Sequence, residues 1–275
     1  MPALKNGPSL KYPGAKWRLA DWIISHLPQH TTFVEPFFGS GAVFFNKPAS
    51  KSEYINDLDG DICNLFRVMR EQPDRLAGLI DFTPYSRDEY ELAYEPTTDP
   101  VERARRTLVK HWLSIGGNGG GRYITGWRHS GAKSARSKSC VMEWDRLPER
   151  ILAHARRLKG THIENRPALE LLGRLNHPTV LAYVDPPYHP DTRKGRMYNE
   201  EMLFEAQHVE LLEFLANDWQ GMCVLSGYPH PLYDDLLTGW ARIERTAGAE
   251  MGQTRTEVLW LNPAAEKRGL FGGDA

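Results

Sequence analysis

Cysteine is scarce in this chain of 275 residues, and no long apolar run occurs in it. Cys63, Cys140 and Cys223 are too widely separated for a disulfide framework or a zinc site, so buried reduced thiols are expected. The ten histidines show no spacing typical of metal ligands, and no metal is expected. Because the chain lacks a membrane-spanning stretch and the apolar run of a signal peptide, a cytoplasmic location and no membrane partner are expected.

The chain has almost no net charge, but its charge is unevenly distributed. The segment from Arg103 to Lys159 holds fourteen Lys or Arg and three acids, a local balance of +11 that leaves −12 for the remainder of the chain, whose net charge is −1. Aromatic residues and many glycines interrupt this basic segment. Such a composition predicts a surface that binds nucleic acid, whereas an ordinary solvated helix face mixes both signs.

The glycine-rich part of this basic segment holds the side chains best suited to contact DNA. Arginine can bind guanine through two hydrogen bonds, lysine can contact phosphate, and an aromatic ring can enter a groove or stack on a base. The aromatic residues could equally form the core of so small a segment. The candidates are Asn118, Arg122, Tyr123, Trp127, Arg128, Lys133, Arg136 and Lys138.

Helical and β-prone segments alternate on both sides of the basic segment, which predicts an α/β fold. Helices are expected at 17–27, at 42–46, from Asp59 onward and at 207–215, and strands at 31–34, 53–56, 180–184, 222–226 and 258–261. Residues 73–157 break this rhythm with mostly helical pieces. We therefore expect them to form an insert in a domain made of residues 1–72 and 158–275.

A glycine-containing turn follows the first expected strand. Gly39 and Gly41 stand where the first turn of a doubly wound sheet lets the backbone approach a ligand, and Asp57, after the next strand, can accept the hydroxyls of a ribose. The third glycine of the dinucleotide fingerprint is missing, and Glu35 would repel a pyrophosphate but attract a cation. A ligand without phosphates, such as S-adenosylmethionine, is therefore favoured.

The tetrapeptide Asp185-Pro186-Pro187-Tyr188 follows an apolar run that predicts a strand. A nucleobase amine is a poor nucleophile because its lone pair is delocalised into the ring, so methyl transfer to it requires acceptors for both hydrogens. The Asp185 carboxylate and the Pro186 carbonyl can supply them, because Pro187 has no N–H and a fixed φ. Tyr188 can stack on the flat ring. The alternative is a simple proline turn at the end of a strand.

These motifs together resemble the Dam-like family of DNA adenine methyltransferases, in which a cofactor half, a target-recognition insert and a catalytic half follow one another. The resemblance covers about residues 8–70 and 160–262 and is weak in the insert. It implies a Rossmann-like doubly wound methyltransferase sheet with a mostly helical, basic target-recognition insert. The segments that carry it are residues 11–16 (KYPGAK), 33–44 (FVEPFFGSGAVF), 54–57 (YIND) and 183–188 (YVDPPY).

The resemblance also implies roles for single residues. Tyr12, where many relatives have tryptophan, and Lys16 would contact the cofactor, and Asp57 would bind its ribose. Glu164 and Arg166 would lie near its adenine, although the family often has an aromatic residue where this chain has Arg166. The other cofactor-binding candidates are Glu35, Phe37, Gly39, Ser40, Gly41 and Asp185.

The implied reaction is direct methyl transfer from S-adenosylmethionine to the 6-amino nitrogen of an adenine flipped out of double-stranded DNA. The catalytic candidates are Asp185, Pro186, Pro187 and Tyr188. Three alternatives are methylation of cytosine, RNA or a protein amide; a nicotinamide-dependent oxidoreductase; and a DNA-binding protein that has lost its activity. A bacterial or phage-infected cell is the expected setting, and the recognition sequence, a cognate restriction endonuclease and the oligomeric state stay open.

Overall fold

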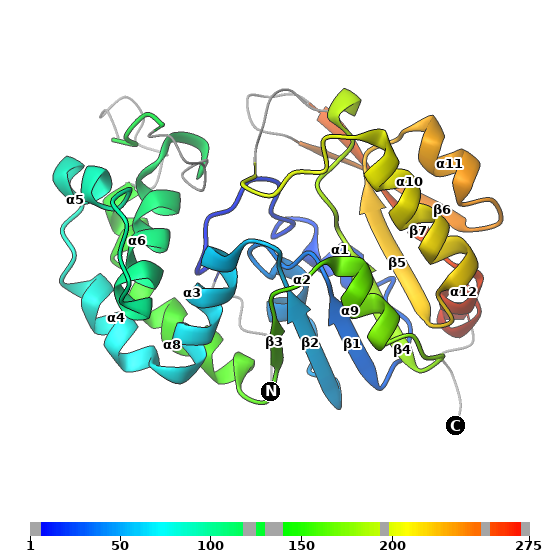
Figure 1. The fold of residues 1–275 in the computed structure, drawn as a ribbon, viewed down its shortest axis with the longest axis horizontal. Helices are drawn as coiled ribbons and strands as arrows, with labels where there is room; N and C mark the ends of the chain where they lie inside the picture. Colours follow the sequence, from blue (N-terminus) through cyan, green and yellow to red (C-terminus); the bar gives the residue numbers. More distant parts are fainter. Residues whose placement is uncertain (1–6, 118–124, 130–139, 193–197, 249–253, 271–275) are drawn as a thin grey trace.

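The structure is a computed structural model that describes residues 7–117, 125–129, 140–192, 198–248 and 254–270. It is an α/β fold built on a sheet of seven strands in the order β3-β2-β1-β4-β5-β7-β6 (Figure 1). The strands are β1 Thr32–Glu35, β2 Ser52–Asn56, β3 His162–Glu164, β4 Val180–Val184, β5 Met222–Gly227, β6 Ala241–Gly248 and β7 Thr254–Leu261. The expected doubly wound α/β architecture is confirmed.

The centre of the sheet is parallel, and its order reverses beside β1. β1 pairs with β2 on one side and with β4 on the other, all parallel, while β7 is antiparallel to both β5 and β6. Two neighbouring strands whose connections leave in opposite directions create a crevice at their carboxyl ends, where ligands bind in such sheets. The motif after β1 and the tetrapeptide after β4 both start at this crevice.

Helices cover both faces of the sheet, because successive strand residues point to opposite sides. Along β1, Phe33 belongs to one buried core and Val34 to the other; along β4, Tyr183 and Val184 divide in the same way. The first core includes residues of α1 Ala20–Ile24, α2 Ala42–Asn46, α3 Gly60–Glu71 and α12 Pro263–Leu270; the second includes residues of α9 Ala168–Arg174, α10 Glu205–Glu213 and α11 Pro231–Leu236.

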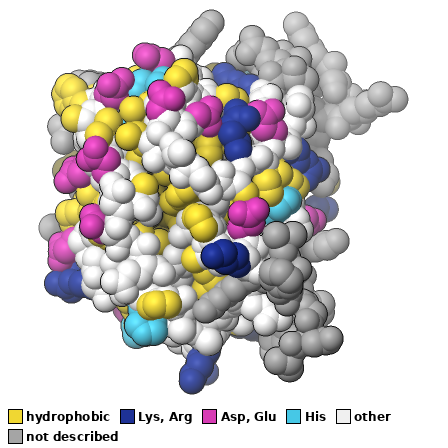
Figure 2. Space-filling model, turned by 90° about the vertical axis from the view of Figure 1, so that its right-hand side faces the viewer, with side chains coloured by type: hydrophobic (Ala, Val, Ile, Leu, Met, Phe, Trp, Pro, Cys, Tyr) yellow, Lys and Arg dark blue, Asp and Glu magenta, His cyan; other side chains and the backbone are white. Residues whose placement is uncertain are grey.

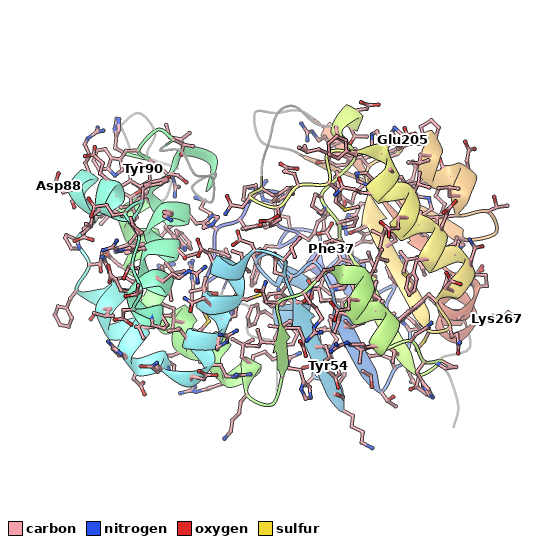
Figure 3. All side chains as sticks on the ribbon, viewed as in Figure 1. Phe37, Tyr54, Asp88, Tyr90, Glu205 and Lys267 are labelled. Carbon is pink, nitrogen blue, oxygen red and sulfur yellow. The ribbon has the colours of Figure 1, made fainter. Side chains whose placement is uncertain are left out.

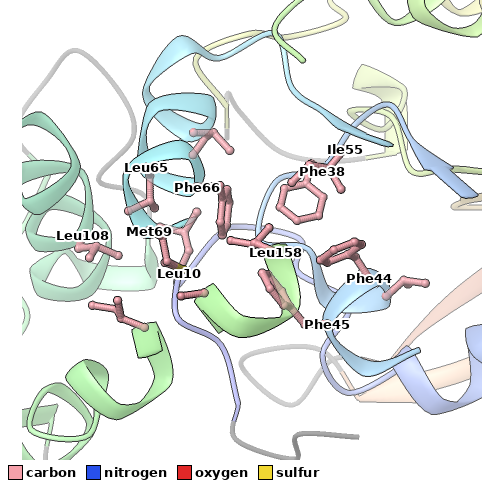
Figure 4. Packing of buried hydrophobic residues seen from close by; sticks show 14 of the residues in the cluster. Leu10, Phe38, Phe44, Phe45, Ile55, Leu65, Phe66, Met69, Leu108 and Leu158 are labelled. Carbon is pink, nitrogen blue, oxygen red and sulfur yellow. The ribbon is translucent and has the colours of Figure 1, made fainter. Parts of the chain in front are cut away.

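The segment between α3 and β3 forms a helical block of five α-helices in the described residues (Figure 1). They are α4 Pro73–Asp81, α5 Arg87–Leu92, α6 Pro100–Leu113, α7 Cys140–Trp144 and α8 Leu147–Leu158. Aromatic side chains join this block to the sheet, and Figure 4 shows Phe38, Phe44, Phe45 and Phe66 converging near Leu158 of α8. The ring of His154, also on α8, stacks on Phe45 with centroids 3.8 Å apart.

One face of the molecule away from the helical block carries charges of both signs. Figure 2 shows the face on which α10 to α12 lie, with acidic and basic side chains scattered among apolar ones. Within the described residues, no helix is long and apolar enough to cross a membrane. All three cysteines are buried and none forms a disulfide, which confirms the expectation from their spacing.

Some expected elements differ from the structure. The helix expected at 17–27 is regular only from Ala20 to Ile24, and the helix expected at 207–215 passes into a π-helical turn at Phe214–Asp218. The edge strand β6 was not expected from its sequence, because its apolar alternation is limited to Ala241 and Ile243 and polar residues follow. Its pairing with β7 defines it instead.

Candidate active site

An open cavity of about 810 Å³, a volume that includes its solvent-open mouth, lies at the carboxyl ends of β1 and β4. Figure 3 labels Phe37, one of its lining residues, near the middle of the view, close to the central strands of the sheet. Residues from the N-terminal motif, the turn after β1, the end of β2, the tetrapeptide and the segment before α10 form its wall.

Two glycines with left-handed backbone shape the turn after β1. Gly39 has φ +48° and Gly41 φ +65°, conformations that favour residues without a side chain. A Cβ on Gly41 would lie 2.3 Å from the ring of Phe38, and one on Gly39 would lie 3.1 Å from the ring of Tyr12. The turn therefore packs its backbone directly under an aromatic face that lines the cavity.

Asp57, at the end of β2, ties this turn to the neighbouring strand. Its Oδ2 accepts a hydrogen bond from the Gly39 N–H at 2.8 Å, and its Oδ1 accepts one from the Asp59 N–H at 2.9 Å. Removal from water raises the pKa of Asp57 to about 7, although these two donors oppose the shift. Each carboxylate oxygen retains a further lone pair that a ligand hydroxyl could use.

Glu35, the last residue of β1, lines the cavity with an unsatisfied carboxyl oxygen. Its side chain is buried, and its Oε2 has no hydrogen-bond partner among the described residues. Burial, together with the negative charge of Asp185, raises the pKa of Glu35 well above its ordinary value. A cationic group in the cavity would lower that pKa and satisfy the oxygen.

Asp185 follows β4 and is held from two sides. Its Oδ1 accepts a hydrogen bond from Ser226 Oγ of β5 at 2.9 Å, and Lys16 Nζ lies 3.1 Å from the same oxygen. The hydroxyl of Tyr183 and that of Ser226 are also within hydrogen-bonding distance, at 3.1 Å. The carboxylate therefore has a fixed orientation at the wall of the cavity.

The other members of the tetrapeptide lie differently. Pro187 lines the cavity, whereas Pro186 and Tyr188 do not. Tyr188 is 8% exposed; its hydroxyl donates to Glu257, Lys16 lies over its ring, and the ring of Tyr228 meets it edge-on with centroids 4.5 Å apart. Stacking of Tyr188 on a base would require that its ring be uncovered, so this role stays a prediction.

The structure brings eight of the eleven predicted cofactor residues together at the cavity wall, whereas Gly41, Glu164 and Arg166 do not line the cavity. Ser40 lines the cavity with its hydroxyl accepting from Trp17 Nε1 at 3.0 Å. Glu164 and Arg166 do not line it and form an ion pair with one another at 2.7 Å. Their predicted roles stay predictions. The predicted residues that line the cavity are Tyr12, Lys16, Glu35, Phe37, Gly39, Ser40, Asp57, Asp185 and Pro187.

Of the predicted DNA-binding residues, Trp127 and Arg128 lie in the described part of the chain, and both make internal contacts. The guanidinium of Arg87 lies 4.8 Å from the centroid of Trp127, and Arg128 donates to Glu143 at 3.0 Å. Contact with DNA by either residue stays a prediction. The others, which lie outside the described residues, are Asn118, Arg122, Tyr123, Lys133, Arg136 and Lys138.

Several site residues were not predicted from the sequence. Tyr198 lines the cavity and stacks on Tyr12 with centroids 5.6 Å apart, and Glu257 of β7 reaches the tetrapeptide from the far end of the chain. An acid directly before an apolar strand segment, as Glu257 is before Val258 to Leu261, was the available signal for a buried carboxylate.

One further group of potential ligands lies next to the tetrapeptide. Donor atoms of His189, Asp191 and His230 lie within 4.8 Å of one another, and the two imidazoles stack with centroids 4.1 Å apart. None of the three lines the cavity. The expectation that the protein binds no metal therefore stays a prediction.

Comparison with known proteins agrees with this arrangement. The family model for D12 class N6 adenine-specific DNA methyltransferases matches residues 12–107 and 131–243, more than half of the chain. The DNA adenine methylase of Salmonella typhi is 29% identical over 223 residues, 78% of this chain and 77% of that protein. That of Escherichia coli (strain K12) is 28% identical over 194 residues, 68% and 66% of the two chains. The Type II methyltransferase M1.LlaDCHI of Lactococcus lactis subsp. cremoris is 27% identical over 283 aligned positions, 93% and 95% of the two chains. This chain therefore belongs to the D12 class of N6 adenine-specific DNA methyltransferases and is an enzyme that methylates adenine in DNA.

Proposed function

We propose that the cavity binds S-adenosylmethionine and that Asp185 and Pro186 hold the 6-amino group of the target adenine beside it. The charge of the cavity wall supports the choice of cofactor. Among the described lining residues, five are acids, and Lys16 is the one lysine or arginine. A wall with this balance favours a ligand that carries an ammonium and a sulfonium over one that carries phosphates.

The residues present fit this cofactor. The buried, unpartnered oxygen of Glu35 suits a cationic group, and the oxygens of Asp57 suit the ribose hydroxyls. The glycine turn lets a ligand approach the backbone below the ring of Tyr12. When bound, S-adenosylmethionine supplies a methyl group on a positively charged sulfur, which an amine can attack directly.

The tetrapeptide would activate the amine by accepting its hydrogens. Asp185 is fixed by Ser226 and reaches the cavity, and Pro187 leaves the Pro186 carbonyl without a neighbouring N–H to compete for it. Because a base inside a duplex hides its amino group, the adenine must be flipped out to reach these acceptors. The carboxylate then stabilises the positive charge that develops on nitrogen, an effect of fixed electrostatics.

The helical block would position the DNA. It belongs to the part of the chain between residues 73 and 157, which includes most of the basic segment that gives a local balance of +11. A positive surface beside a cavity rich in acids can bind the phosphates of the duplex while the cavity receives the neutral base. We therefore assign residues 1–72 and 158–275 to catalysis and residues 73–157 to target recognition.

The experiment that tests this proposal is expression in a host that lacks adenine methylation, followed by sequencing of modified bases in its DNA. The proposal expects N6-methyladenine within one fixed flanking sequence. Purified protein with radiolabelled S-adenosylmethionine should modify the same sites in duplex DNA. Methylcytosine in place of methyladenine, or no cofactor-dependent labelling, would refute it.

A further inference from the structure

Glu257 is a buried carboxylate beside the tetrapeptide that has no role in the mechanism described so far. It lies on β7, which pairs with β5, and it is 5% exposed. Its Oε1 accepts the hydrogen bond of the Tyr188 hydroxyl and lies 3.7 Å from Lys16 Nζ. A buried acid is costly unless it is paired, so its two partners explain how it is accommodated.

Lys16 lies between two carboxylates. Its Nζ is 3.1 Å from Asp185 Oδ1 and 3.7 Å from Glu257 Oε1, and it lies 4.5 Å from the centroid of the Tyr188 ring. Burial alone would lower the pKa of Lys16, but the charges of Asp185 and Glu257 outweigh it and raise that pKa. Lys16 is therefore charged, and it lies next to Asp185 and the ring of Tyr188, the groups that the proposed mechanism assigns to the target adenine.

A charged ammonium competes strongly with a neutral base amine for a carboxylate, because charge-assisted hydrogen bonds are about twice as strong as neutral ones. Both the Lys16 and the Ser226 contact fall on Oδ1 of Asp185, so a looser Lys16 contact would make this oxygen available to the adenine hydrogens, provided that Lys16 keeps a countercharge. Among the described residues, Glu257 is the other carboxylate within 4 Å of its Nζ. An approach of about 1 Å would complete a charged hydrogen bond between Lys16 and Glu257.

We propose that Glu257 is a positioning residue that receives the Lys16 ammonium when the target adenine enters, and so frees Asp185 and the ring of Tyr188 for the base. This inference rests on the proposed function. Glu257 touches neither the cofactor nor the base; it acts through Lys16, while its hydrogen bond fixes the Tyr188 hydroxyl.

The test is the single-turnover rate of adenine methylation by Glu257→Gln at saturating DNA and S-adenosylmethionine. Glutamine keeps an oxygen that can accept from Tyr188 but removes the charge that attracts Lys16. The rate should fall about tenfold or more, the lower range for one charged hydrogen bond. Binding of both substrates and the melting temperature should stay near wild type. Glu244→Gln, the same charge change at an exposed position on β6, is the matched control.

A Lys16→Met background separates this role from a structural one. If Glu257 acts by drawing away Lys16, then Glu257→Gln should cause no further loss once Lys16 is methionine. An equal loss in both backgrounds, or an unchanged rate in the single variant, would overturn the inference alone. A wild-type protein that fails to methylate adenine would instead overturn the proposed function, and this inference with it.

Discussion

The crevice of the sheet and the helical block differ in what their polar side chains contact and in whether these side chains line a cavity. At the crevice, nine predicted residues converge on one cavity, and Glu35 keeps a buried oxygen without a partner. In the described part of the helical block, many charged side chains pair with one another, and its buried atoms without a hydrogen-bond partner, such as Arg128 Nη1 and His154 Nε2, do not line the cavity. Arg105 contacts both Glu102 and Glu89 at 2.7 Å, and Arg128 contacts Glu143 at 3.0 Å.

The two regions differ in how the geometry of the chain brings polar side chains together. Parallel strands end at the same edge of a sheet, so residues that follow β1, β2 and β4 must meet there whatever their other contacts. Helices impose no such convergence, and their charged residues can satisfy one another. A buried polar atom without a partner is therefore a stronger sign of a ligand at the crevice, where Glu35 lines a cavity, than in the helical block.

Substitution of the turn glycine should give the largest effect and sharpen this comparison. Gly41→Ala forces a side chain into a left-handed conformation and against Phe38, and we expect a loss of about 2 to 5 kcal/mol in the free energy of unfolding. Chemical denaturation measures it. The matched change Gly78→Ala in α4, where no atom lies within 4 Å of the added Cβ, should stabilise by about 0.5 to 1 kcal/mol. Equal changes in the free energy of unfolding at the two sites would contradict the conclusion that the turn after β1 requires glycine at position 41.

Replacement of the acid at the end of β2 should weaken cofactor binding. Asp57 accepts hydrogen bonds from two backbone N–H groups, and in Asp57→Asn the side-chain NH₂ would face one of these donors. The substitution also removes the negative charge. Affinity for S-adenosylmethionine should therefore fall about 10- to 100-fold. Because the pKa of Asp57 is about 7, wild-type affinity should rise between about pH 6 and pH 8 as the carboxylate ionises. Calorimetry at several pH values checks both, and a wild-type affinity independent of pH would argue against the ribose role.

The smallest effect is expected in the helical block. Arg128 is held by Glu143, and each of the two side chains is more than a quarter exposed. Arg128→Gln should lower DNA affinity and reduce the salt slope by about 0.9, whereas Glu143→Gln should release the arginine and raise affinity up to about fivefold. Fluorescence anisotropy at two salt concentrations distinguishes them. Changes of the same sign in both variants would show that Arg128 is purely structural.

Much of the crevice could be predicted from the sequence because its residues follow short apolar strands. The strand at 180–184 and the helix at 42–46 have the bounds expected of them, and the residues after each strand carry the chemistry. Local sequence suffices there, since the strand determines where the next residue points.

The contacts that depend on distant pairing could not be predicted. Glu257 reaches Tyr188 because β7 runs antiparallel between β5 and β6, an order that no local pattern reveals. The ion pair between Arg128 and Glu143 likewise joins two residues that lie fifteen positions apart in the chain. Lys16 was expected at the cofactor, and its contact with Asp185 adds a second partner.

The most direct measurement of the proposed mechanism is single-turnover methylation by Asp185→Ala at saturating S-adenosylmethionine and duplex DNA. Lys16 would keep Glu257 as a countercharge, so the protein should fold and bind both substrates. The proposed mechanism predicts a rate lower by about a hundredfold or more, because the acceptor and stabilising charge for the amino group are lost. A rate equal to that of the wild type would contradict it.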